Sequence, residues 1–347
     1  MFVKSLTVAA IAGAVLFSAS PALADDPGLY GAGDPTYDGV YRQSLSILAL
    51  EATGRAVPKR ALKWLKRQQC DDGGFTAYRA DTTSACPAPD PVNYAGQDSN
   101  STALAIAALW HTGAKKPARK AASWLSAHVN PDGGWAYYPA PGATSETNST
   151  AVALAALRLT GKKPSGKYLR GVQVPCPAPG VVPGGLRYDS SSPDVNDNAT
   201  AQAAWVLGGG LRLPAARPLA RKAPRSVCKD VGVRATPKRV AGAARGYLAD
   251  RLASVGGALP YGGGYPGTDH VGSAQAALAL AQAGVGRKVV KTTVKSLQKD
   301  AQTWITANGD DSPGAIAMLI LVADATGQNP KNFADMNLMA RLAKTRQ

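Results

Sequence analysis

Six hydrophobic stretches of similar sequence recur along the chain, and each ends at a glycine. They are rich in Ala and Leu on nearly every helical face, and they cover residues 44–54, 101–113, 149–161, 199–210, 272–284 and 314–327. A helix that is apolar all round is usually buried on all sides. The pattern therefore predicts six inner helices, each closed by a C-terminal glycine.

A second, amphipathic stretch follows most of these glycines. In residues 59–69, apolar side chains fall on one helical face while Lys and Arg occupy the other. Each repeat therefore predicts an inner helix paired with a solvated outer helix. Such pairs bury their apolar faces only when they are stacked on neighbouring pairs.

The connection from each outer helix to the next inner helix is long, whereas the return connection is short. The long connections carry paired glycines at Gly73-Gly74, Gly133-Gly134, Gly184-Gly185 and Gly256-Gly257, mostly beside aromatic residues. This asymmetry predicts that all long loops gather at one end of the stack. Residues 211–236, rich in Pro, Arg and Lys, break the period and are interpreted as an insertion.

The repeat resembles the QW motif of the prenyltransferase/squalene-cyclase superfamily. In that motif an aromatic-Leu pair on an outer helix leads through Gln to a Gly-aromatic turn. Here Trp64-Leu65 leads through Gln68 to Gly73-Gly74-Phe75, and Trp124-Leu125 leads to Gly133-Gly134-Trp135. The resemblance implies an all-α fold, an (α/α)6 toroid of six helix pairs, over residues 38–347.

The first residues predict export from the cell. Residues 1–24 combine Lys4, an apolar run and an Ala-Leu-Ala cleavage site, which is typical of a signal peptide cleaved after Ala24. The run is shorter than the roughly 20 residues that span a membrane. We expect a secreted, extracellular protein that does not span a membrane, with a short lead-in over residues 25–37.

The chain is strongly basic, with 39 Lys and Arg against 23 Asp and Glu and a net charge of +16. Many of these cations lie on the predicted outer helices, where a solvated surface explains them. An anionic cell-wall polymer is the alternative partner, and no nucleic acid is expected because no recognised binding module is present.

Four cysteines remain after the signal peptide, and three pairings are open to them. We favour a local disulfide between Cys70 and Cys86, and a second between Cys176 and Cys228 that would tether the insertion.

The chemistry of the resembling families fits this chain poorly. Class II terpene cyclases use an Asp-x-Asp-Asp acid, which does not occur here. Protein prenyltransferases hold zinc through an Asp-x-Cys pair, but Ala199 stands where the Cys would follow Asp197. No metal and no cofactor are therefore predicted. Cobalamin-carrier toroids bind their ligand with a second domain, so a membrane transporter or a second-domain partner would complete the site here.

Polar residues recur at the starts of the inner helices. Parallel inner helices would place these starts around one opening, together with the aromatic side chains of the long loops. N-capping is the alternative role for each polar residue. The candidate ligand-binding residues are Asp98, Asn100, Trp135, Tyr137, Glu146, Asn148, Asp197, Tyr261, Tyr265, Asp269, His270 and Asp311.

Two functions are consistent with this pattern. The first is non-catalytic capture of a small molecule or glycan in the aromatic opening, with a corrinoid as one candidate ligand. The second is an enzyme, either a divergent terpene cyclase or a glycan lyase or hydrolase that uses carboxylates at the inner-helix starts. Two carboxylates about 5 to 9 Å apart would favour the enzyme, and carboxylates occupied as caps would favour the binding protein.

Overall fold

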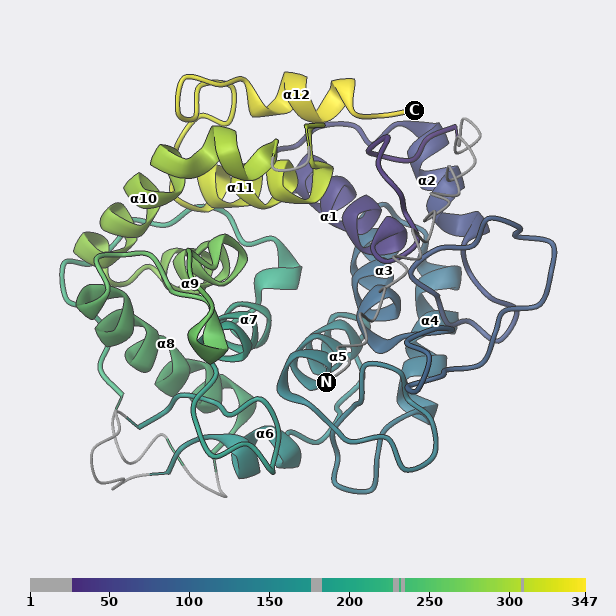
Figure 1. Cartoon of the computed structure of the whole chain (residues 1–347), viewed down its shortest axis with the longest axis horizontal. Coiled ribbons are helices and arrows are strands. Elements are labelled where there is room, and N and C mark those ends of the chain that lie inside the picture. Colours follow the sequence, from purple (N-terminus) through teal and green to yellow (C-terminus); the bar gives the residue numbers. More distant parts are fainter. Residues whose placement is uncertain (1–26, 176–182, 227–230, 232–234, 307–308) are drawn as a thin grey trace, which may run out of the picture.

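A ring of paired helices forms the chain, in agreement with the expected (α/α)6 toroid (Figure 1). The structure is a computed structural model that describes residues 27–175, 183–226, 231, 235–306 and 309–347. The predicted signal peptide, Cys176 and Cys228 lie outside these residues. Inner helices are α1 (Gly39–Ala52), α3 (Ser99–His111), α5 (Thr147–Leu159), α7 (Asp197–Leu207), α9 (His270–Gln282) and α11 (Pro313–Ala325). Outer helices are α2 (Lys59–Arg67), α4 (Lys115–Ala127), α6 (Lys167–Val172), α8 (Pro237–Ser254), α10 (Arg287–Ile305) and α12 (Leu338–Lys344).

The inner helices form a closed inner circle. Each contacts the next along the chain, and α11 contacts α1 to complete the ring. Their Ala-rich faces are buried almost throughout, because small side chains allow close packing on every side. All six begin at the same end of the ring, which we call the mouth end, and finish at the other, the turn end.

A hydroxyl near the start of four inner helices fixes the long loop that precedes it. Thr102 Oγ1 accepts a hydrogen bond of 3.0 Å from the Phe75 amide, and Thr150 Oγ1 accepts one of 2.8 Å from Trp135. The Leu186 and Leu259 amides donate in the same way to Thr200 and Ser273, each at 2.9 Å. The repeated hydroxyls are therefore structural.

The Gly-Gly turn is required by the next repeat. Gly73 has a φ of +111°, which side chains rarely adopt. A Cβ on Gly74 would lie 2.7 Å from the Trp124 ring, so only glycine fits. In the same way Gly134 meets Tyr168 and Gly185 meets Tyr247, so three outer-helix aromatics pack against the loop of the preceding repeat. This explains why the motif couples the two residue types.

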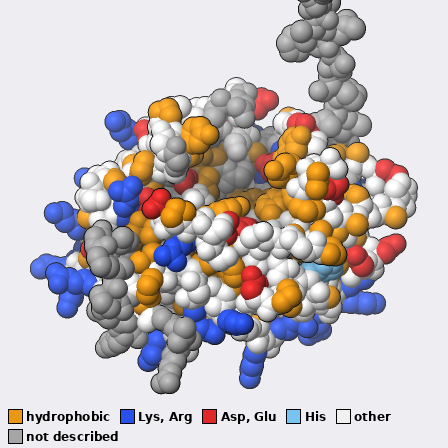
Figure 2. Space-filling view, turned by 60° about the horizontal axis from the view of Figure 1, so that its bottom comes forward, with side chains coloured by type: hydrophobic (Ala, Val, Ile, Leu, Met, Phe, Trp, Pro, Cys, Tyr) orange, Lys and Arg blue, Asp and Glu red, His pale blue; other side chains and the backbone are white. Residues whose placement is uncertain are grey.

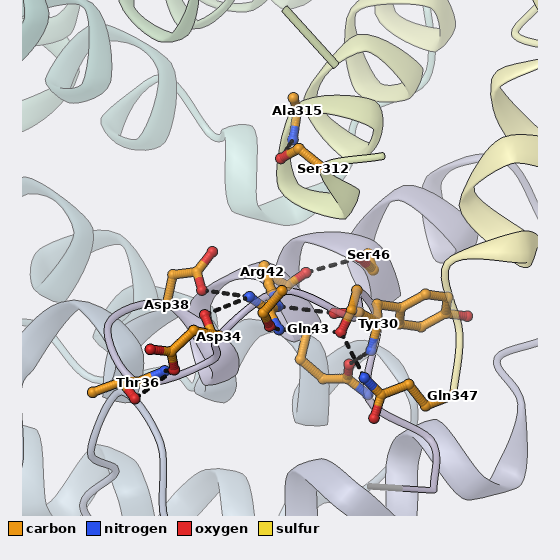
Figure 3. Close-up of polar contacts among 12 residues, drawn as sticks. Tyr30, Asp34, Thr36, Asp38, Arg42, Gln43, Ser46, Ser312, Ala315 and Gln347 are labelled. Carbon is orange, nitrogen blue, oxygen red and sulfur yellow. Dashed lines mark hydrogen bonds and ion pairs between the residues drawn. The ribbon is translucent and has the colours of Figure 1, made fainter. Parts of the chain in front are cut away.

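The lead-in and the C-terminus close the ring along a seam, formed by residues 28–42 and 345–347 (Figure 3). Gly28 N–H donates to the Gln347 carbonyl, and Gln347 N–H donates to the Leu29 carbonyl, both at 2.9 Å. The buried Arg42 of α1 donates all five of its N–H groups to oxygens of this segment. The lead-in is therefore part of the fold.

The predicted disulfide between Cys70 and Cys86 is confirmed, with Cα atoms 5.7 Å apart. The described residues of the insertion cross the turn end of the ring. Ala220 N–H donates to the Gly284 carbonyl at 2.9 Å, and His111 Nε2 lies 2.8 Å from the Leu211 carbonyl oxygen. No helix in the described part of the chain is long and apolar enough to cross a membrane.

Candidate functional site

Two cavities open at the mouth end, where the inner helices begin. The first, the mouth pocket, has a volume of about 710 Å³ and lies over the starts of α5, α7 and α9. The second, the tyrosine pocket, has a volume of about 470 Å³ and is lined by Tyr94, Tyr137, Tyr138 and Glu146. Tyr188 lines both. In Figure 2, hydrophobic side chains surround a hollow, and many Lys and Arg side chains lie along the outer edge.

Side-chain amides connect three inner helices across the mouth pocket. Asn148 of α5 donates from Nδ2 to Asn198 Oδ1 at 3.2 Å and to Gln202 Oε1 at 2.5 Å. Asn198 of α7 donates in turn to Asp269 Oδ2 at the start of α9, at 2.8 Å. Asn148, Asn198 and Asp269 line the pocket, so their side chains offer a row of hydrogen-bonding groups to a ligand. We call this row the amide chain.

The carboxylates at three inner-helix starts act as N-caps. Asp98 Oδ1 accepts from the Ser101 amide at 2.7 Å, and Asp269 Oδ1 accepts from Gly272 at 2.7 Å. Glu146 uses both oxygens to accept from two amides of α5, each at 2.8 Å. These groups satisfy free helical N–H groups, which is the alternative role weighed from the sequence.

Asp98 is the most deeply buried of these carboxyls. It is fully buried, and within the described residues Oδ2 has no hydrogen-bond partner. Burial raises the pKa of this carboxyl to about 7, because the charged form loses its hydration. Burial also raises the pKa of Glu146. Asp98 lines neither mouth cavity, so it lies below the surface that a ligand would contact.

Asp197 and Asp311 are held by ion pairs. Asp197 lines the mouth pocket, accepts from Arg251 Nε at 2.8 Å and accepts from the Tyr247 hydroxyl at 2.6 Å. Asp311 pairs with Arg341 and joins α11 to α12. Asp311 is therefore a tether of the last helix and lines neither cavity, unlike the expectation from the sequence.

The aromatic candidates separate into core and pocket. Trp135 is buried in the core and donates from its indole Nε1 to the Leu125 carbonyl at 2.7 Å. It cannot face a ligand, because the Gly-Gly turn directs it inward. Tyr137 lines the tyrosine pocket and Tyr261 lines the mouth pocket. Tyr265 is 74% exposed and lines neither cavity.

His270 faces an outer helix and not the mouth. Its Nε2 lies 3.2 Å from Asp300 Oδ2 of α10, and its ring stacks on Trp304 with centroids 5.3 Å apart. It therefore offers no ligand to a corrinoid in either cavity. Asn100 likewise lines neither cavity. Across the described ranges, no group of three or more His, Cys, Asp or Glu residues could hold a metal ion.

The candidate set omitted several residues of the mouth pocket and its amide chain, among them Tyr188, Asn198, Gln202 and Arg251. Asn198 carried a usable signal, because it occupies the second position of α7 as Asn100 and Asn148 do in α3 and α5. Gln202 lies one turn further along α7 and contacts Asn148. Arg251 lies on an outer helix with no counterpart in other repeats, so nothing in the sequence pointed to it.

Comparison with known proteins supports the fold and goes no further. No sequence-family profile and no curated protein matches the chain. One similar structure is a type II terpene cyclase, MstE from Scytonema, in complex with geranylgeranyl dihydroxybenzoate. It aligns with a TM-score of 0.51 and 13% sequence identity, over 84% of this chain and 88% of the cyclase chain. A protein from Actinoplanes aligns with a TM-score of 0.51 at 16% identity over 88% of this chain and 95% of that one. The resemblance to terpene-cyclase-like toroids is thereby confirmed at the level of fold.

Proposed function

We propose that this chain is an exported, non-catalytic binding protein that captures a small polyhydroxylated ligand, such as a sugar or short glycan, in the mouth pocket. The observation that carries the proposal is the amide chain from Asn148 through Asn198 to Asp269, which lines that pocket. Amide and carboxylate groups fixed on helix ends suit hydroxyl groups, because they donate and accept at set positions.

The aromatic side chains beside the amide chain also favour a polyhydroxylated ligand. Tyr188 and Tyr261 line the pocket and are 45% and 48% exposed, so their ring faces remain accessible. A ring face beside polar groups binds a sugar through its C–H surface while the polar groups contact its hydroxyls. A second domain or membrane transporter would then receive the ligand across the open mouth.

The state of the carboxylates favours binding over hydrolysis. Glycan cleavage uses two carboxyl groups facing one bond. Here Glu146 and Asp269 cap helices and Asp197 pairs with Arg251, so their oxygens are already occupied. The catalytic alternative rests on Asp98, whose raised pKa would suit a general acid. That role would require an opening that brings a substrate to this buried carboxyl.

Two tyrosines four residues apart provide a matched test. Tyr261 lines the mouth pocket, whereas Tyr265 is more exposed and lies outside it. The probes are chitotriose, cellotriose and maltotriose, titrated calorimetrically into the wild type, Tyr261→Ala, Tyr265→Ala and Asn198→Leu. We expect at least one sugar to bind, with affinity reduced about tenfold or more in Tyr261→Ala and Asn198→Leu, and unchanged in Tyr265→Ala.

Two results would overturn the proposal. One is the absence of binding for every sugar, or the turnover of any of them, which would favour the enzyme. The other is an equal loss of affinity in Tyr261→Ala and Tyr265→Ala, which would move the site away from the mouth pocket. Circular dichroism and thermal unfolding of each variant establish that the ring stays folded.

A further inference from the structure

A third cavity lies at the turn end of the ring, opposite the mouth. It has a volume of about 510 Å³ and is formed by the ends of α5, α7 and α9, by α8 and by the first part of the insertion. Five cationic side chains of the described residues line it, and none of the described residues in its lining is Asp or Glu. They are Arg158, Arg212, Arg217, Lys238 and Arg245.

The two most buried cations of this cavity have no partner among the described residues. Arg158 and Arg245 are partly buried, and within the described ranges neither side chain makes a hydrogen bond or ion pair. Burial lowers the pKa of both guanidinium groups, and the charge of Arg212 lowers the pKa of Arg158 further. Among the described residues, the Arg212 side chain donates to a backbone oxygen alone, the Arg158 carbonyl at 3.5 Å.

The partial negative charges of the helix ends at this cavity can balance only part of its positive charge. Arg158 lies in the last turn of α5, where a cation complements the partial negative charge of the carbonyl end. Arg245 lies in the middle of α8, and Arg217 belongs to the insertion. Three helix ends supply the equivalent of roughly half a charge each, which is far less than five full positive charges.

We propose that the turn-end cavity binds a small anion that carries two or more phosphate groups. Guanidinium groups pair with phosphate through two parallel hydrogen bonds, so unpaired arginines around one cavity match this ligand class. The volume falls within the range of sites for small molecules. The proposal is independent of the mouth pocket, because the two cavities lie at opposite ends of the inner helices.

Phosphate groups reach such a cavity from two sources. A free small molecule would enter whole, whereas a phosphate-containing polymer would contact mainly the exposed cations at the rim, Arg212, Arg217 and Lys238. Inorganic pyrophosphate represents the first source and long-chain inorganic polyphosphate the second. Because the chain has a net charge of +16, general attraction of polyanions must be separated from binding in the cavity.

The test compares two double variants that remove the same charge. Arg158→Gln with Arg212→Gln removes two cations from the cavity, and Lys63→Gln with Lys66→Gln removes two exposed cations from α2. Pyrophosphate is titrated calorimetrically at fixed ionic strength into the full chain. We expect saturable binding to the wild type, affinity reduced about tenfold or more in the cavity variant, and unchanged affinity in the α2 variant.

The folded state of the cavity variant is checked without anion. Its thermal midpoint should equal or exceed that of the wild type, because two like charges have been removed. Absence of pyrophosphate binding, or an equal loss in both double variants, overturns the proposal. So does binding of polyphosphate alone, because that result assigns the charge to the surface and not to the cavity.

Discussion

Two arginine environments at different places in the ring show how differently one side chain can be used. At the seam, Arg42 is 5% exposed and directs each of its five N–H groups at an oxygen of residues 30–38 (Figure 3). In the turn-end cavity, Arg245 is also partly buried, yet it contacts no acceptor within the described ranges. Both groups carry the same charge, and they differ most clearly in their hydrogen-bond partners.

This difference separates a structural cation from one that is available to a ligand. Four of the five Arg42 acceptors are Tyr30, Gly31, Gly33 and Asp34 carbonyls, which exist at these positions because the lead-in folds around the guanidinium. The cost of burying the charge is offset there by hydrogen bonds. Arg245 bears that cost without such bonds, so its burial is better explained by a ligand than by stability.

The seam should therefore be the more sensitive of the two regions. Arg42→Gln removes the charge and most of its donors, and leaves buried carbonyl oxygens without partners. We expect the free energy of unfolding to fall by about 3 to 5 kcal/mol, measured by urea denaturation. Arg60→Gln, at an exposed arginine of α2, is the control and should change stability by less than about 0.5 kcal/mol. A loss below about 1 kcal/mol in Arg42→Gln would contradict the comparison.

A buried anion at the mouth end extends the comparison to the opposite charge. Like Arg245, Asp98 has an unpartnered atom, and burial raises its pKa to about 7 from the ordinary 3.8. Between these values the folded protein keeps a proton that the unfolded chain has lost, so stability falls as pH rises from about 4 to about 7. Above the folded-state pKa the loss is complete.

Asp98→Asn removes this pH dependence while keeping the helix cap. The corresponding cap of α7 is already an asparagine, Asn196, whose Oδ1 accepts from the Ala199 amide at 2.8 Å. We expect the stability of the variant relative to wild type to rise by about 2 to 4 kcal/mol between pH 4.5 and pH 8. Urea denaturation at both pH values measures the change, and a difference that does not vary with pH would show that Asp98 titrates normally.

The architecture could be predicted from sequence because it depends on local patterns. Ala-rich stretches that end in glycine identify the inner helices, and a Gly-Gly turn after a Trp-Leu pair fixes how neighbouring repeats pack. These features recur, so each copy supports the others. The cysteine pairing between Cys70 and Cys86 was also accessible, because the two residues close a short loop.

The site was less accessible because it depends on side-chain direction. Trp135 and Tyr137 stand two residues apart on one loop, but the first enters the core and the second lines the tyrosine pocket. On α8, Arg251 pairs with Asp197 of the neighbouring helix α7, whereas Arg245, less than two turns earlier, has no partner among the described residues. No composition or spacing distinguishes the members of these pairs.

The smallest expected effect is the one that separates the two arginine environments most directly. Arg245→Met keeps the length of the side chain and removes a charge that lacks a partner. No acceptor in the described part of the chain loses a hydrogen bond in this variant. We therefore expect the free energy of unfolding to rise by about 1 kcal/mol at low salt. The rise should be smaller at high salt, because salt screens the repulsion from Arg158 and the other cavity cations. Urea denaturation of wild type and variant at 50 and 500 mM NaCl measures both effects. A loss of stability comparable with that of Arg42→Gln would mean that Arg245 has a structural partner. Its guanidinium would then not be available to a ligand in the turn-end cavity.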